Sequence, residues 1–242
     1  MKNQEYDLKQ DGFTFLRGFI DKKDLDSIQS YASELLDYLS FEKGTDFFKL
    51  SLNEKMTYLE KKSRPDFFTF CKELSKIPSV YSIAGSVISY FDTDKIIGSQ
   101  THYLDSEVFF NKADVSRLLY DWHSENSYYP NAKEVLTIWF PWLQPVSKEN
   151  GTMIMAKGSN KKTYTTTRIN KKESVTQVKI SEADLNEFQK IDCNLSLGDL
   201  VVFSSKAVHR SGINKTEEPR VAMVIRLSSL TGKLDSGWQA EA

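Results

Sequence analysis

The run Asp121-Trp122-His123-Ser124-Glu125 is the stretch around which the rest of the chain is organised. It follows Leu119-Tyr120 and is typical of a β-strand that leaves the core. Side chains at positions i and i+2 of a strand point to the same face. We therefore expect His123 and Glu125 to direct one imidazole and one carboxylate into the same cavity, which is most of a metal site.

A third ligand has to come from elsewhere in the chain, and His209 in Val208-His209-Arg210-Ser211-Gly212 is the best candidate. We expect His209 to lie on a strand across the barrel from His123. Two histidines and one carboxylate on one face of an open site form the facial triad of non-haem Fe(II) oxygenases. The remaining histidine, His102, lies outside any such pair and is expected to be structural.

Arg220 follows His209 through a polar turn and is expected to lie on the next antiparallel strand, beside the metal. An arginine inside a barrel needs an anionic partner, because an unpaired buried charge is very costly. The diacid 2-oxoglutarate would supply that partner, with its keto acid end on iron and its far carboxylate paired with Arg220. Ser211 lies two residues beyond His209, so it can offer a hydroxyl to the same carboxylate.

The two halves of the chain differ in their hydrophobic pattern. Residues 1–95 are predicted to be mostly helical, although Phe13-Thr14-Phe15-Leu16 alternates as a short strand. An apolar stripe at helical spacing contains Leu25, Ile28, Ala32, Leu35, Leu36 and Leu39. Ser51, followed three residues later by Glu54, is a helix-start signal. Residues 181–190 are read as one further short helix.

Residues 96–230 read as strands separated by turns, and residues 135–143 are the most strand-like run. This pattern predicts a mainly β fold with a helical layer. The expected architecture is a double-stranded β-helix, a jelly roll of the cupin kind, with the N-terminal helices packed on one sheet. We expect one domain over residues 1–242, with residues 1–95 as support and residues 96–230 as the jelly-roll core.

Composition narrows the functional classes. The formal net charge is -1, which gives no electrostatic reason to expect nucleic acid or an anionic membrane as partner. The two cysteines, Cys71 and Cys193, lack metal-type spacing and are expected to be reduced thiols of a cytoplasmic protein. No run of residues is long and apolar enough to predict a membrane span. The expected assembly is a monomer or a homodimer.

Several motifs in this order resemble the phytanoyl-CoA dioxygenase family of Fe(II)/2-oxoglutarate oxygenases. They are residues 10–19 (QDGFTFLRGF), 122–125 (WHSE), 136–143 (LTIWFPWL), 149–153 (ENGTM), 157–161 (KGSNK), 198–203 (GDLVVF), 209–212 (HRSG) and Arg220. The resemblance implies that His123, Glu125 and His209 bind iron and that Arg220 and Ser211 hold 2-oxoglutarate. It further implies that Trp139 flanks this cosubstrate, although a place in the sheet core explains Trp139 equally well.

The sequence departs from the family pattern at three places. The family usually carries aspartate where this chain has Glu125, but glutamate offers the same oxygen donor, so iron binding is expected to survive. The family's Gly-Ser-His after the Asn-Gly hairpin is Gly158-Ser159-Asn160 here. The polar residue that contacts the cosubstrate from the preceding strand is not identified. Thr101, Tyr103 and Ser106 compete for that role, and Lys112 matches a family lysine.

The resemblance and the residues together predict an Fe(II)/2-oxoglutarate-dependent dioxygenase. Its expected reaction is hydroxylation of a small-molecule metabolite with O2 and release of succinate and CO2, although desaturation or epimerisation would use the same residues. A non-catalytic jelly-roll binding protein and a cupin-like metalloenzyme without 2-oxoglutarate are the alternatives, and neither needs Arg220. Candidate substrate contacts, for which a core position is the competing explanation, are Tyr128, Tyr129, Trp142, Tyr164 and the loop 163–172.

Overall fold

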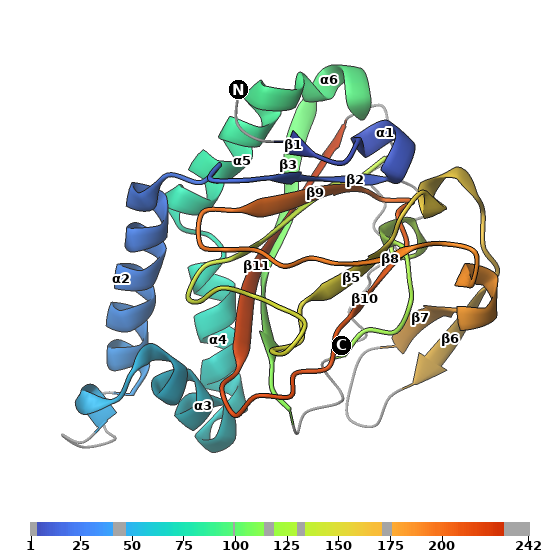
Figure 1. The fold of residues 1–242 in the computed structure, drawn as a ribbon. Helices are drawn as coiled ribbons and strands as arrows, with labels where there is room; N and C mark the ends of the chain where they lie inside the picture. Colours follow the sequence, from blue (N-terminus) through green and yellow to red (C-terminus); the bar gives the residue numbers. More distant parts are fainter. Residues whose placement is uncertain are drawn as a thin grey trace.

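A six-stranded antiparallel sheet runs through the molecule (Figure 1). The computed structural model describes residues 4–40, 47–98, 100–113, 119–129, 134–170 and 176–229. In spatial order the strands of this large sheet are β1 (Gln4–Glu5), β2 (Phe13–Leu16), β9 (Leu200–Ser204), β4 (Leu136–Pro141), β11 (Arg220–Ser229) and β3 (Thr101–Asn111). Every residue of β4 and β11 is buried, as expected for central strands.

A smaller sheet faces the large one. Its strands are β10 (His209–Ser211), β5 (Met153–Ala156) and β8 (Lys190–Asp192), and a separate hairpin pairs β6 (Thr166–Asn170) with β7 (Thr176–Ile180). Apolar side chains fill part of the space between the sheets, among them Phe13, Trp139, Met155, Val201 and Phe203. The expected double-sheet architecture is confirmed.

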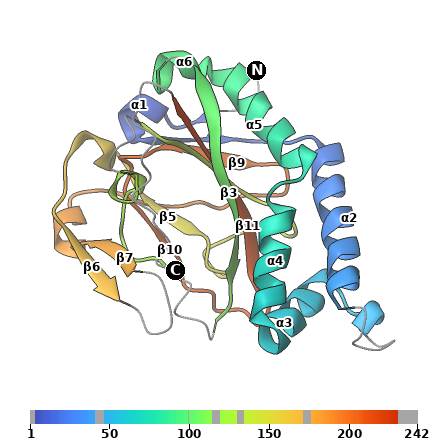
Figure 2. The same ribbon diagram turned by 180° about the vertical axis from the view of Figure 1, so that it is seen from behind.

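Helices cover the opposite face of the large sheet (Figures 1 and 2). The main ones are α2 (Lys22–Leu39), α3 (Leu52–Lys62), α4 (Arg64–Leu74) and α5 (Pro78–Phe91), with short α1 (Leu8–Asp11) and α6 (Thr93–Ile96). Leu25, Ile28, Ala32 and Leu36 of α2 are buried, as the apolar stripe predicts. The predicted start of α3 is also confirmed, because Ser51 and Glu54 form a reciprocal capping box.

Side chains along β11 point alternately to the core under the helices and to the space between the two sheets. Val221, Met223, Ile225 and Leu227 belong to the core under the helices. The intervening side chains point to the other face, so the run carries Arg220 and Arg226 toward the space between the sheets. The strand therefore has one apolar face and one face with two cations.

One local expectation is confirmed and another is wrong. The short strand predicted over Phe13–Leu16 is β2 of the large sheet, and β1 lies beside it. The expected helix over residues 181–190 is only a 3-10 turn, η6 (Glu182–Leu185), followed by β8. Other 3-10 turns are η2 (Phe47–Lys49), η4 (Glu125–Ser127) and η5 (Ser159–Lys161).

Within the described ranges, no helix has the length and apolar character needed to cross a membrane.

Gly151 closes the turn before β5 and is the glycine whose replacement we expect to cost most. Its φ is +80°, and a Cβ there would lie 2.5 Å from the backbone nitrogen of Asn214. Gly151→Ala should lower the free energy of unfolding by at least about 2 kcal/mol, because it combines a left-handed backbone with a backbone clash. Urea denaturation measures this.

Gly85 in α5 provides the matched control. A Cβ at Gly85 meets nothing within 4 Å, and the residue lies inside a helix. Gly85→Ala should therefore raise the free energy of unfolding by roughly 0.5–1 kcal/mol. An unchanged urea midpoint for Gly151→Ala would contradict the close approach seen at that turn.

Candidate metal centre

His123 and His209 are direct neighbours on paired backbone segments. The backbone N–H of each residue donates to the carbonyl oxygen of the other, both at 2.9 Å. Directly opposed residues of an antiparallel pair place their side chains on the same face, and the two imidazole centroids are 4.2 Å apart. The expectation that His209 lies across the barrel from His123 is therefore wrong, because the two histidines lie side by side.

Glu125 completes the cluster from the start of η4. The predicted strand ends before this residue, but Ser124 is extended, so Glu125 still points to the same side as His123. Glu125 Oε1 lies 3.6 Å from His209 Nε2. One ligand atom from each of the three residues lies within 4.8 Å of the others.

All three side chains are buried, with relative exposures of 5% for His123, 4% for Glu125 and 5% for His209. The sequence prediction of a His–Glu–His cluster is thus matched by the geometry. His102 takes no part in it.

Hydrogen bonds orient both imidazoles for metal binding. His123 Nδ1 lies 2.7 Å from the carbonyl oxygen of Asp121, and His209 Nδ1 lies 3.1 Å from that of Ala207. A carbonyl oxygen can only accept, so the proton belongs on Nδ1 and the Nε2 lone pair is left for a metal. Burial lowers the pKa of His123 to about 3, which keeps this imidazole neutral near pH 7.

The Glu125 carboxylate is held in its anionic form. Burial acts to raise its pKa, but the positive charge of Arg226, whose Nε donates to Oε2, outweighs burial, and the net pKa is lowered. Two neutral imidazoles and one carboxylate form the donor set that suits Fe(II). The residues present therefore fit an iron ion.

The cluster opens into a cavity of about 230 Å³ between the two sheets. The cavity is lined by Asp105, Glu107, Phe109, Tyr120, His123, Glu125, Tyr128, Tyr129, Thr137, Trp139, Met153, Phe203, His209, Arg210, Ser211, Arg220, Val224 and Arg226. The three residues expected to contact 2-oxoglutarate, Arg220, Ser211 and Trp139, are all among these lining residues.

Arg220 is a buried cation with an incomplete set of partners. It is 3% exposed, and its Nε donates to the carbonyl oxygen of Gly151 at 3.2 Å. Its Nη1 is buried and has no hydrogen-bond partner among the residues that the structure describes. The guanidinium lies 5.5 Å from the ring centre of Trp139, and burial lowers the pKa of Arg220 to about 10.

Ser211 and Arg220 belong to different sheets, which corrects the expectation of neighbouring strands. β10 carries Ser211 and pairs with β5, whereas β11 carries Arg220 and pairs with β3 and β4. Ser211 Oγ accepts a hydrogen bond from the backbone N–H of Tyr120 at 3.2 Å, so its own proton remains free to be donated.

The residues of β3 expected to compete for the cosubstrate contact do not line the cavity. Ser106 and Tyr103 hydroxyls both donate to the carbonyl oxygen of Ser75 on the helical side. Thr101 accepts from Thr93, and Lys112 does not line the cavity. The β3 residues that line it are Asp105, Glu107 and Phe109.

Some of the aromatic residues expected to contact the substrate line the cavity, and others do not. Tyr128 and Tyr129 line the cavity. Trp142 is buried in the core under the helices, and Tyr164 packs against Phe188 in a separate cluster. Of the loop 163–172, the last two residues lie outside the described part of the chain.

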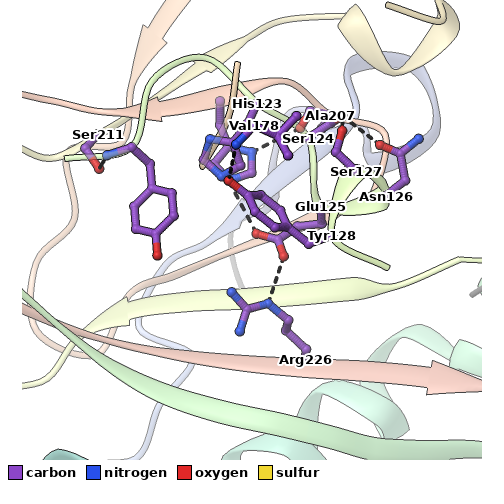
Figure 3. A network of polar contacts seen from close by, with 12 residues as sticks. His123, Ser124, Glu125, Asn126, Ser127, Tyr128, Val178, Ala207, Ser211 and Arg226 are labelled. Carbon is purple, nitrogen blue, oxygen red and sulfur yellow. Dashed lines mark hydrogen bonds and ion pairs between the residues drawn. The ribbon is translucent and has the colours of Figure 1, made fainter. Parts of the chain in front are cut away.

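Arg226 is a site residue that we did not predict. Its Nε donates to Glu125 Oε2 at 2.8 Å, and its Nη1 donates to Asp105 and Glu107, each at 2.9 Å (Figure 3 shows the contact with Glu125). Arg226 is an even number of residues beyond Arg220 on the same strand, so strand alternation would have placed it on the cavity face.

Comparison with known proteins agrees with this geometry. The model of the family described as Phytanoyl-CoA dioxygenase (PhyH) matches residues 8–222. A search of curated proteins finds no match.

Solved structures share the fold at low sequence identity. EvdO2 from Micromonospora carbonacea var. aurantiaca has a TM-score of 0.60 and 16% identity, over 95% of this chain and 94% of that one. EctD from S. alaskensis, solved with bound Fe, has a TM-score of 0.57 and 14% identity, over 97% and 83%. The epimerase SnoN, in complex with Fe3+, alpha ketoglutarate and nogalamycin RO, has a TM-score of 0.55 and 17% identity, over 93% and 81%.

Proposed function

The chain belongs to the phytanoyl-CoA dioxygenase family, and on that premise we propose that it is an Fe(II)/2-oxoglutarate-dependent oxygenase of a small-molecule substrate. One observation carries the proposal. A buried His123–Glu125–His209 cluster opens into a cavity that also contains Arg220, a buried cation with an unpaired Nη1. A candidate metal site and a candidate anion site thus share one cavity. We treat the whole chain as one catalytic domain.

Each site residue has a distinct task in this proposal. The Nε2 atoms of His123 and His209 and the Oε1 atom of Glu125 bind Fe(II). Arg220 pairs with the far carboxylate of 2-oxoglutarate and thereby gains the partner that its guanidinium lacks. Ser211 donates its free hydroxyl proton to the cosubstrate, and the ring of Trp139 forms the wall below Arg220.

The bound iron and 2-oxoglutarate supply the activation of O2, with succinate and CO2 as the products of the cosubstrate. The protein keeps bulk water away from this chemistry, because its ligands are buried between two sheets. Glu125 supplies a carboxylate as the third protein ligand, which suits hydroxylation or a related oxidation, and we propose hydroxylation as the outcome.

We place the substrate at the outer part of the cavity, beside the rings of Tyr128 and Tyr129 and the carboxylates of Asp105 and Glu107. Arg226 contacts both carboxylates and also Glu125, so its single positive charge is shared among three negative ones, and this part of the cavity disfavours polyanions. We expect neutral or cationic molecules, and not coenzyme A thioesters, to stimulate succinate release. Stimulation confined to polyanionic compounds would contradict this placement.

A spectroscopic experiment tests the proposed function without knowledge of the substrate. Anaerobic addition of Fe(II) and 2-oxoglutarate should give a weak visible charge-transfer band, because the keto acid chelates the metal. Succinate, which lacks the keto group, is the matched control and should give no band. A protein that binds Fe(II) but shows no band with 2-oxoglutarate would instead be a metal protein that does not use this cosubstrate.

A further inference from the structure

Arg226 connects a metal ligand to the outer part of the cavity. Its Nε–H donates to Oε2 of Glu125, the carboxylate oxygen other than the one nearest His209. Its Nη1 donates to Asp105 Oδ1 and Glu107 Oε2. The Arg226 side chain is only 8% exposed, so one buried guanidinium bridges three carboxylates.

We propose that Arg226 is a positioning residue that occupies Glu125 Oε2 and leaves Oε1 as the single oxygen for the metal. This inference rests on the proposed function, because it assumes that Glu125 binds iron. Two carboxylate oxygens on the metal would take up a coordination position that an open facial site has to keep free. The bond to Arg226 prevents this.

The identity of the ligand makes such support necessary. Glutamate has one more rotatable bond than aspartate, so its carboxylate can turn or swing away more easily. A hydrogen bond from a fixed donor removes that freedom, as partners of metal-bound carboxylates commonly do. Arg226 gives a charged donor at 2.8 Å, within the range of strong charge-assisted bonds.

The donor itself is fixed from its other end. Asp105 and Glu107 hold Nη1, and the hydroxyl of Tyr129 donates to Asp105 Oδ2 at 2.6 Å. The guanidinium also lies 5.7 Å from the ring centre of Tyr129. Asp105 and Glu107 belong to β3, which pairs with β11 along its length. The position of Glu125 Oε2 is therefore set by the large sheet, although Glu125 itself lies in a short turn.

The test measures metal binding alone, with Co(II) in place of Fe(II) and no cosubstrate. Arg226→Met should weaken Co(II) binding by about 10- to 100-fold, the usual effect of losing a partner of a metal ligand. It should also change the visible Co(II) spectrum, because the second oxygen of Glu125 becomes free to bind. Isothermal titration calorimetry and absorption spectroscopy give the two readouts, and the thermal midpoint of the apo protein reports on folding.

A mutant cycle separates positioning from a merely structural role. In a Glu125→Asp background the shorter carboxylate should not reach Arg226, so adding Arg226→Met should change Co(II) affinity less than threefold. A structural role for Arg226 would produce the same loss in both backgrounds and would overturn the inference. If Arg226→Met does not fold, Arg226→Lys replaces it. Lysine keeps the charge but cannot contact all three carboxylates at once, so we expect a smaller loss of Co(II) affinity than for Arg226→Met. This loss should again be present in the wild-type background and absent in the Glu125→Asp background.

The outcomes distinguish the two proposals. Wild-type protein that gives no charge-transfer band with Fe(II) and 2-oxoglutarate would contradict the proposed function, whatever Arg226 does. If the wild-type protein gives the band but the Arg226 variant keeps its Co(II) affinity and spectrum, only the proposed role of Arg226 is overturned.

Discussion

Replacing His209 by alanine is expected to abolish metal binding and with it the turnover of 2-oxoglutarate. The variant keeps only two of the three clustered ligands. Loss of a mere partner of a ligand costs about 10- to 100-fold in metal affinity, so loss of a ligand should exceed that range. Calorimetry with Co(II) and measurement of succinate release with Fe(II), 2-oxoglutarate and O2 provide the two readouts.

The fold should survive this substitution. The pairing of residues 123 and 209 runs through backbone atoms, which alanine retains. His209 does pack against the ring of Phe203 at 4.7 Å, so a modest loss of stability is expected. A thermal melt of the apo variant will therefore distinguish loss of the ligand from loss of the structure. His123→Ala should behave in the same way.

His102→Ala is the matched control. His102 lies on β3 outside the cluster, and neither of its ring nitrogens has a hydrogen-bond partner within the part of the chain that the structure describes. The variant should bind Co(II) with wild-type affinity. Retention of a full equivalent of tightly bound metal by His209→Ala would show that the three residues are not the metal site.

Residue types and spacing predicted the cluster of His123, Glu125 and His209, because that donor set suits Fe(II). The spatial arrangement of the three residues was not predicted. The direct pairing of His123 with His209 depends on which segments of backbone meet, and no local pattern specifies such a long-range choice. For the same reason the sequence placed His209 across the barrel when it lies beside His123.

The helices were predicted more accurately than the strand that borders the cavity. The start of α3 depends on Ser51 and Glu54, which are three residues apart, so the signal is local. The faces of β3 depend on a register shift opposite Arg226 and Leu227. Tyr103 pairs with Leu227 on the helical face, whereas Asp105 pairs with Arg226 on the cavity face. Simple alternation would put Tyr103 and Asp105 on the same face of the sheet, but the bulge between them turns the two side chains to opposite faces.

Arg226 escaped prediction because its role depends on residues that are distant in the sequence. Within the run 220–229 it is the second of two arginines, and apolar residues flank it on both sides. Only the folded chain brings Glu125, Asp105 and Glu107 around it. A buried arginine in a central strand does, however, imply carboxylate partners, since an unpaired charge there is very costly.

Arg220→Ala is expected to weaken 2-oxoglutarate binding by at least about 30-fold and to leave metal affinity unchanged. Removing one member of a buried, hydrogen-bonded charge pair costs about 2–5 kcal/mol, and 1.4 kcal/mol corresponds to a factor of 10. Calorimetric titration of the anaerobic Fe(II) protein with 2-oxoglutarate measures the loss. Arg210→Ala is the matched control. Arg210 also lines the cavity, but it stacks on Trp122 and lies 3.8 Å from Glu182.

A second ligand makes the test specific for the far carboxylate. The monoacid 2-oxobutyrate keeps the keto acid end and lacks the group that Arg220 is proposed to bind. Its affinity should be the same in wild type and in Arg220→Ala, so the difference between the two ligands should disappear in the variant. An equal loss for both ligands would mean that the substitution disturbs the metal end of the cavity, and the assignment of Arg220 would be wrong.

The stability of the apo protein gives an independent reading of the same residue. Arg220 is buried with Nη1 unpaired, so its charge is uncompensated before the cosubstrate binds. Arg220→Met should therefore melt at or above the wild-type temperature in the absence of ligand. Addition of Fe(II) and 2-oxoglutarate without O2 should then raise the wild-type melting temperature well beyond that of the variant, because only the wild type gains a partner for a buried cation. A variant that is stabilised as much as the wild type would place the diacid elsewhere in the cavity.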